Sequence, residues 1–197
     1  MKSFRKLFFL FIGIVIIIVL TRYYSSYWYD LSESPWAYSR NPQEQLLIGK
    51  WQGDFTDPDG VKKHIDLTIL IPTTNEERWE SAFTFHKKTH RYSRNKDAFF
   101  EGLATVKSKL GTEEYEISGH VQEDDIHQLF IHFSTPDDKK KVLPNFTLFE
   151  AKKGLWEGDK MTLTLQFSYQ KANGSSFWSS SIPKYSAKIN CGLFRVN

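Results

Sequence analysis

An unbroken apolar stretch opens the pattern of hydrophobic and polar positions along this chain. Leu7–Leu20 contains fourteen residues without a charge or a strongly polar group. At about 1.5 Å per residue a helix over this stretch is about 21 Å long, shorter than a hydrocarbon core of about 30 Å. Extension to Phe4–Tyr24 gives about 31 Å and places aromatic side chains at one membrane interface. The pattern therefore predicts a transmembrane helix.

A cleaved signal peptide is the alternative for this segment, because it also combines a charged start with a short apolar run. Cleavage needs small residues at alternating positions after the run, whereas residues 21–28 are rich in Tyr and Trp. The sequence thus favours an uncleaved signal anchor. Lys2, Arg5 and Lys6 precede the run, so the positive-inside bias places the N-terminus in the cytoplasm and the C-terminal domain outside. Together with a composition rich in Lys, Ile and Phe, this predicts a bacterial inner-membrane protein with a periplasmic or extracellular domain.

Beyond the anchor the pattern changes twice. Asp30–Arg40 has no periodicity and is predicted to be a linker. Asn41–Glu44 has the residues of a helix start, with Asn as N-cap and Pro at the first helical position. From Leu46 onward the apolar residues alternate with period two. We expect residues 1–29 to form a cytoplasmic tip and anchor, 30–45 a linker with a short helical turn, and 46–197 a single β domain.

About nine strands follow from this alternation and from the turn signals between the segments. The predicted strands are Leu46–Thr56, 65–71, Trp79–His90, Ala98–Leu110, Glu113–Val121, Ile126–Ser134, Asn145–Lys152, Lys160–Tyr169 and Tyr185–Val196. Short links and the lack of a long amphipathic helix favour an antiparallel meander, and closure into a barrel removes its edges most simply. The predicted fold is all-β: an antiparallel up-and-down barrel of about eight or nine strands after one transmembrane helix. A sandwich or an open roll is the alternative.

The first predicted strand and the last one carry a family resemblance. Gly49-Lys50-Trp51 stands at the head of the first strand, after a short helical turn. This arrangement resembles the calycin superfamily of lipocalins, fatty-acid-binding proteins and avidin-like barrels. Members of that superfamily place an Arg or Lys late in the last strand, packed over the Trp, and this chain has Arg195 there. The resemblance implies a lipocalin-like barrel in which Gly49, Trp51 and Arg195 close one end as structural residues.

Net charge changes the picture only when the anchor is set apart. The whole chain has 26 basic and 23 acidic residues, a formal net charge of +3. Four of the basic residues flank the apolar run and no acidic residue precedes Asp30, so 22 basic and 23 acidic residues remain from there on, a net charge of −1. The basic character belongs to the anchor, and the composition gives no reason to expect a nucleic-acid partner.

Residues that could carry chemistry are few and scattered. Cys191 is the single cysteine, and a buried, inert thiol is its ordinary interpretation. His86 and His90 would be about 13 Å apart on one face of a strand, too far to share a metal. We therefore expect no catalytic residues, no metal, no cofactor and no enzymatic activity. Glu101 and His120 are the first candidates if the barrel is a hydrolase or an isomerase after all.

The sequence thus leads to two main hypotheses of function, both non-enzymatic. In the first, a membrane-anchored domain of the cell envelope binds a small apolar ligand or a protein segment inside its barrel. The candidate lining residues are Trp79, Phe83, Phe85, Phe99, Glu101 and Phe133. Glu101 either points into a cavity or belongs to the polar face of its strand. In the second hypothesis the barrel is solidly packed, and the protein is a structural or interaction subunit of a membrane-associated envelope complex.

Overall fold

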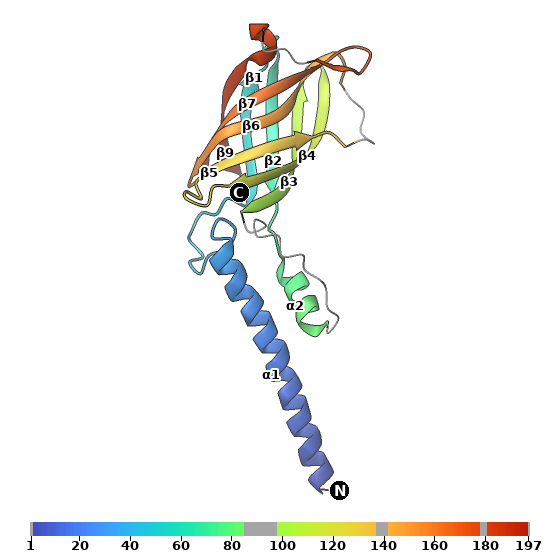
Figure 1. Ribbon diagram of the computed structural model, residues 1–197, viewed down its shortest axis with the longest axis vertical. Helices are drawn as coiled ribbons and strands as arrows, with labels where there is room; N and C mark the ends of the chain where they lie inside the picture. Colours follow the sequence, from blue (N-terminus) through green and yellow to red (C-terminus); the bar gives the residue numbers. More distant parts are fainter. Residues whose placement is uncertain (1, 85–97, 137–141, 178–180, 197) are drawn as a thin grey trace.

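A β-barrel stands on one end of a long N-terminal helix in the computed structural model (Figure 1). The structure describes residues 2–84, 98–136, 142–177 and 181–196. The barrel is closed, antiparallel and eight-stranded, with one additional short strand, and the apolar helix precedes it. The predicted fold class is therefore confirmed.

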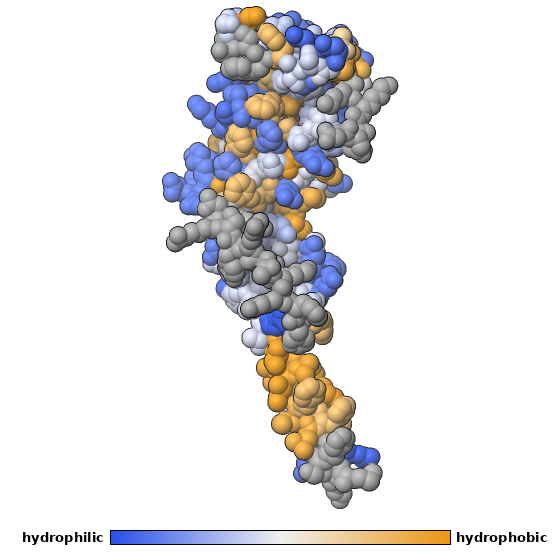
Figure 2. Space-filling model, turned by 45° about the vertical axis from the view of Figure 1, so that its right-hand side comes forward, coloured by the Kyte–Doolittle hydropathy of each residue, from blue (hydrophilic) through white to orange (hydrophobic). Residues whose placement is uncertain are grey.

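The N-terminal helix α1 spans Lys2–Glu33. It is long and apolar enough to cross a membrane, and the apolar side chains of its lower part are exposed. Figure 2 shows this part as a continuous hydrophobic stem below a mixed, largely polar body. The helix runs past residue 29, where we expected a linker. It ends just before the Ser34-Pro35 pair, because a proline disfavours helical geometry in the residue that precedes it.

The segment between α1 and the barrel covers the end of the barrel nearest to α1, which we call the base. Trp36 is fully buried, and its ring centroid lies 5.8 Å from that of Phe100 in the barrel. The amide of Leu47 donates to the carbonyl of Trp36 at 2.9 Å. Asn41–Glu44 forms one hydrogen-bonded turn instead of the expected helical turn.

The eight barrel strands pair with their neighbours around a closed ring. They are β1 (Gly49–Thr56), β2 (Lys62–Ile69), β3 (Phe99–Ser108), β4 (Gly111–Val121), β5 (Gln128–Ser134), β6 (Asn145–Glu157), β7 (Lys160–Gln170) and β9 (Lys188–Val196). Strand β9 pairs with both β7 and β1 and so closes the ring. The two-residue strand β8 (Ser176–Phe177) and the 3₁₀ turn η1 (Pro183–Ser186) lie between β7 and β9 in the sequence.

Buried and exposed side chains alternate along these strands. In β2 the residues at every second position from Lys63 to Ile69 are buried, and in β7 the same holds from Met161 to Phe167. Because successive side chains of a strand point to opposite sides, each strand places one set inside the barrel and one outside. The tight turn between β1 and β2 is fixed by Asp57, whose Oδ1 accepts from the amides of Asp59 and Val61, both at 2.9 Å.

The prediction of a third strand over Trp79–His90 is wrong for residues 79–83, because the chain forms helix α2 (Asn75–Phe83) there. A capping box starts this helix: the Thr74 hydroxyl accepts from the amide of Glu77, and the Glu77 carboxylate accepts from the amide of Thr74. The helix packs beside α1, and the Trp79 ring stacks on Tyr23 with centroids 4.1 Å apart. The rest of the predicted strand, from Phe85 to His90, lies outside the described residues.

Candidate functional site

The barrel interior, the first candidate site, is filled with side chains. All eight strands contribute fully or almost fully buried apolar residues to one continuous core. Phe133 is one of them, 3% exposed, with its ring edge-on to that of Tyr115 at 5.9 Å. Space left by interior glycines is also occupied, since a Cβ at Gly119 would lie 2.3 Å from the ring of Phe100. This packing resembles the solid filling of a small eight-stranded barrel.

Of the five predicted lining residues that the structure describes, it brings one into this interior. Phe133 lies inside; Trp79, Phe83, Phe99 and Glu101 lie outside the barrel, and Phe85 falls outside the described residues. The register of β3 explains two of these placements. Its inward positions are Phe100, Gly102 and Ala104, so Phe99 and Glu101 point outward, and Phe99 is 50% exposed. Glu101 therefore belongs to the polar face of its strand.

The base of the barrel is closed by Arg195 on β9. Its guanidinium carbon lies 4.3 Å from the centroid of the Trp51 ring, directly across the β1–β9 pairing. The guanidinium donates to the carbonyl of Ile48 at 2.8 Å, to that of Leu46, and to Asp159 Oδ1 at 3.0 Å. Stacking on an indole face and donating to main-chain carbonyls suits a cation that is largely removed from water.

Gly49 leaves room for this arrangement. Its φ is +118°, a region that residues with a side chain rarely adopt. A Cβ there would also approach Arg195 Nη1 to 3.1 Å. The structure thus brings Gly49, Trp51 and Arg195 together at the base. Strand β9, which carries Arg195, ends next to the point where α1 meets the barrel (Figure 1).

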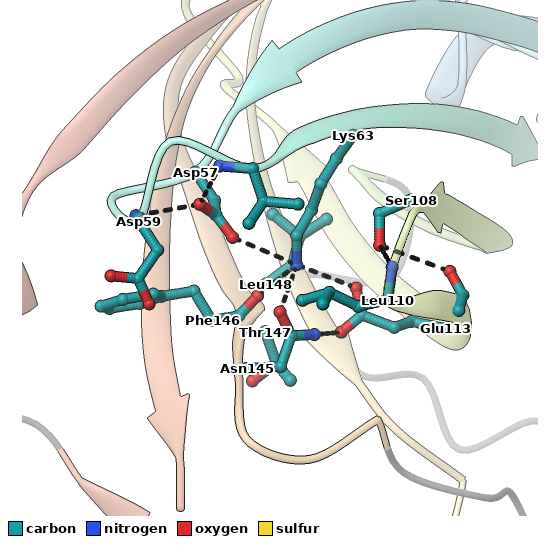
Figure 3. Close-up of polar contacts among 12 residues, drawn as sticks. Asp57, Asp59, Lys63, Ser108, Leu110, Glu113, Asn145, Phe146, Thr147 and Leu148 are labelled. Atoms are coloured by element: carbon teal, nitrogen blue, oxygen red, sulfur yellow. Dashed lines mark hydrogen bonds and ion pairs between the residues drawn. The ribbon is translucent and has the colours of Figure 1, made fainter.

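The opposite, distal end contains a buried charge cluster built around Lys63 (Figure 3). The Nζ atom of Lys63 donates to Glu113 Oε2 at 3.1 Å, to Asn145 Oδ1 at 2.9 Å and to the carbonyl of Phe146 at 2.6 Å. A second carboxylate oxygen, Asp57 Oδ2, lies 3.7 Å from the same nitrogen. These contacts tie β2, β4 and β6 together.

Electrostatics in this cluster follow from burial. Lys63 is 2% exposed and Glu113 7%. Loss of water raises the pKa of Glu113 above its usual value, although the Lys63 ammonium acts in the opposite direction. The neighbouring Tyr115 is held far above its usual pKa, first by burial and then by the Glu113 charge. All three ammonium hydrogens of Lys63 already have acceptors, which suits a structural cation better than a nucleophile.

Aromatic rings complete the distal end. Phe146 and Tyr169 lie with centroids 4.9 Å apart, and Tyr185 of η1 packs on both, at 5.8 Å and 5.5 Å. Phe177 of β8 meets Tyr185 at 5.0 Å. A hollow of about 40 Å³ beside Glu113 is large enough for only a few water molecules. Both ends of the barrel are therefore blocked by side chains.

The outer wall of β3, β4 and β5 carries a row of aromatic rings, in which Phe99 is exposed and His120 and Phe130 are half-buried. Phe99, His120 and Phe130 form one row across the three strands, because Phe99 pairs with His120 and His120 with Phe130. Neighbouring ring centroids in the row are 5.7 Å and 5.4 Å apart. Leu103, on the same face of β3, is 55% exposed.

Acidic side chains border this row on the distal side. Glu101 and Glu116 are exposed on the same outer face, and Glu116 pairs with Leu103 across β3 and β4. We call the surface formed by Phe99, Glu101, Leu103, Glu116, His120 and Phe130 the outer-wall patch. Apolar rings flanked by carboxylates are chemically suited to an apolar segment with basic neighbours.

Comparisons with known proteins identify no family. No family model matches the chain, and no curated protein is similar to it. Among solved structures, EF1p2_mFAP2b bound to DFHBI is 13% identical, with a TM-score of 0.48 over 76% of this chain and 94% of that one. A fluorescence-activating beta barrel designed de novo is 12% identical, with a TM-score of 0.40 over 76% of this chain and 93% of that one. The barrel architecture rests on the strand pairings described above.

Proposed function

We propose that this protein is a single-pass membrane protein whose barrel acts by contact through its outer wall. In this proposal the barrel is a non-enzymatic interaction domain, and the outer-wall patch docks on a membrane-associated protein. The observation that carries the proposal is the contrast between a filled, doubly closed interior and an aromatic row on the outside, exposed at Phe99 and half-buried at His120 and Phe130. An interior ligand would have to displace core side chains, whereas an outer partner would not.

The membrane part of the proposal is supported by α1. Its exposed apolar stretch is long enough to cross a bilayer, and Val19 is the one side chain of Leu7–Leu20 that is buried in the described structure. The basic residues before the stretch favour a cytoplasmic N-terminus. The barrel would then face the outside of a bacterial inner membrane, in the cell envelope. The Trp51–Arg195 stack supports a calycin-like ancestry for the barrel.

The chemistry of the outer-wall patch specifies the partner. Phe99 and Leu103 offer apolar surface, and Glu101 and Glu116 offer negative charge beside it. The partner segment therefore has apolar side chains flanked by Lys or Arg. The row of rings in the patch begins at Phe99, the first residue of β3, and this end of β3 lies at the base. The partner therefore approaches the barrel close to the anchor (Figure 1).

Site-specific photo-crosslinking in the native membrane tests this role. A benzoylphenylalanine replaces Leu103 in the full-length protein, and the control replaces Thr162, which is exposed on β7 across the barrel. We expect one membrane protein to be crosslinked from position 103 only, through a segment with basic residues. Glu101→Lys with Glu116→Lys should abolish this adduct. The absence of a discrete adduct, equal adducts at both positions, or an adduct insensitive to charge reversal would overturn the proposal.

Native mass spectrometry of the detergent-extracted protein gives a second readout. The packed interior predicts the mass of the bare polypeptide. A small apolar molecule other than a bilayer lipid that stays bound in repeated preparations would instead point to a ligand inside the barrel and count against an outer-wall function.

A further inference from the structure

Helix α2 is fixed at a defined height along α1. The Tyr23 ring stacks on Trp79, and Arg22 Nη2 donates to the carbonyl of Thr84, the C-cap of α2, at 3.2 Å. Tyr23 is three residues beyond Leu20, the last residue of the apolar stretch, or about 4.5 Å along the helix axis. The C-terminal end of α2 therefore lies level with the end of the apolar stretch.

A buried arginine makes this contact firm. Arg78 of α2 donates to Asp30 Oδ2 of α1 at 2.7 Å, and its side chain is 2% exposed. Its guanidinium also lies 5.5 Å from the ring centroid of Tyr27 and 5.6 Å from that of Tyr38. Ala82, one turn further along, is buried as well. This face of α2 thus packs against α1 and against the segment below the barrel.

Another face of α2 leaves large aromatic side chains uncovered. Trp79 and Phe83 stack on each other with centroids 6.0 Å apart, and they are 38% and 63% exposed. Glu77 and Ser81 lie on the opposite side of the short helix, where both are exposed. Tyr24, Trp28 and Tyr29 of α1 are also about half exposed. We call Tyr24, Trp28, Tyr29, Trp79 and Phe83 the aromatic collar.

We propose that α2 is a second membrane contact, which sets Trp79 and Phe83 into the headgroup layer of the bilayer that α1 crosses. The inference rests on the membrane anchoring in the proposed function and goes beyond it. A bilayer is about 30 Å of hydrocarbon within a total of about 40–45 Å, so each headgroup layer is about 5–7 Å thick. The collar begins within that distance of Leu20, and Trp, Tyr and Phe rings are the side chains that favour this layer.

Continuity with α1 identifies lipid as the occupant of this surface. Trp79 stacks directly on Tyr23 of α1, just above the exposed apolar stretch, and Phe83 stacks on Trp79. The lipid that surrounds the stretch therefore reaches the collar without a gap. With α1 and α2 both held at the interface, the base of the barrel has two attachment points, and its tilt relative to the membrane is set.

The test uses the full-length protein in phosphatidylcholine nanodiscs, with Cys191→Ala to remove the native thiol. An environment-sensitive NBD label is placed on Phe83→Cys, and on Ser81→Cys as the matched control on the opposite side of α2. A third label on Ile14→Cys reports on α1 in the bilayer. Quenching by shallow and by deep nitroxide lipids and by aqueous iodide is measured for each position, and circular dichroism checks that every variant is folded.

We expect the label at position 83 to be quenched by the nitroxide lipids and protected from iodide, with a blue-shifted emission. The label at position 81 should show the reverse. If position 14 is quenched by the lipids while position 83 is as open to iodide as position 81, the second contact is disproved and the anchor stands. If position 14 is not quenched by the lipids, the anchor itself fails, and the inference fails with it.

Discussion

Replacement of Lys63 by methionine tests the structural reasoning about the distal charge cluster most directly. The substitution keeps a long, flexible side chain but removes the ammonium that Glu113, Asn145 and Phe146 contact. It leaves the carboxylates of Glu113 and Asp57 buried without a cation. Breaking a buried ion pair on one side costs about 3–5 kcal/mol, so we expect the free energy of unfolding to fall by about that amount at neutral pH.

The assay is chemical denaturation of the full-length protein in detergent, followed by tryptophan fluorescence. Lys62→Met is the matched control, because Lys62 is the adjacent lysine of β2 and is exposed. The control should change the free energy of unfolding by less than about 0.5 kcal/mol. Adding Glu113→Gln to Lys63→Met should restore part of the loss, with an interaction energy of about 0.5–3 kcal/mol.

The pH dependence separates charge from packing. Burial raises the pKa of Glu113 above the unfolded value of 4.5, and Lys63 opposes this, so Lys63→Met raises the folded-state pKa further. A raised carboxyl pKa contributes stability below the unfolded value, and this stability is lost as pH rises through the folded value. The destabilisation by Lys63→Met should therefore shrink as pH falls toward about 4.5. A loss that is equal at all pH values, or no larger than that of Lys62→Met, would refute the reasoning.

Three further predictions concern other parts of the barrel. Arg195→Met leaves the carbonyls of Leu46 and Ile48 without their donor, and we expect a loss of about 2–4 kcal/mol in the same denaturation assay; a loss below about 0.5 kcal/mol would contradict the closure of the base. Phe133→Ala should cost about 3–5 kcal/mol and Phe99→Ala less than about 0.5 kcal/mol, since one ring is in the core and the other outside; similar losses would argue against the register of β3 and β5. Burial, aided by Asp54, raises the pKa of the Cys191 thiol to about 12, so the native protein should react with thiol reagents at pH 8 only as fast as it unfolds; rapid labelling without denaturant would show that the thiol is accessible.

The barrel strands could be predicted from the sequence because the alternation of apolar and polar residues and the positions of turn residues agree along most of the domain. The exception, α2, shows how the pattern misleads. Trp79, Ser81 and Phe83 share one face of a strand, but Trp79 and Phe83 are four residues apart and so also share one face of a short helix, with Ser81 on the opposite side. The Thr74–Glu77 capping box was the available signal for a helix start. Packing against Tyr23 of α1, more than fifty positions away, then favours the helix.

Whether the barrel interior is filled or hollow could not be predicted from the sequence in the same way. Alternation shows which residues point inward, but whether they fill the barrel depends on its radius, which strand number and stagger set together. Phe99 was predicted to line the interior and Glu101 either to do so or to lie on the polar face. Both point outward, and a shift of one residue in register is enough to exchange the two faces of a strand. Lys63 shares the inward face of β2, which is a signal for a buried partner. Its partners Glu113 and Asn145 are 50 and 82 residues away. They come together because the barrel is closed and β5 pairs with both β4 and β6.

The closing strand has a consequence for how the chain reaches its native state. β1 and β9 are separated by more than 130 residues, yet β9 supplies the second neighbour of both β1 and β7. During synthesis these two strands have one open hydrogen-bonding edge each until Lys188–Val196 arrives. Pairing over such a separation is slow, so a chain without β9 in place passes through a stage with two open strand edges. In that stage the growing barrel is most prone to pair with another chain, and a chaperone that shields strand edges would be most effective.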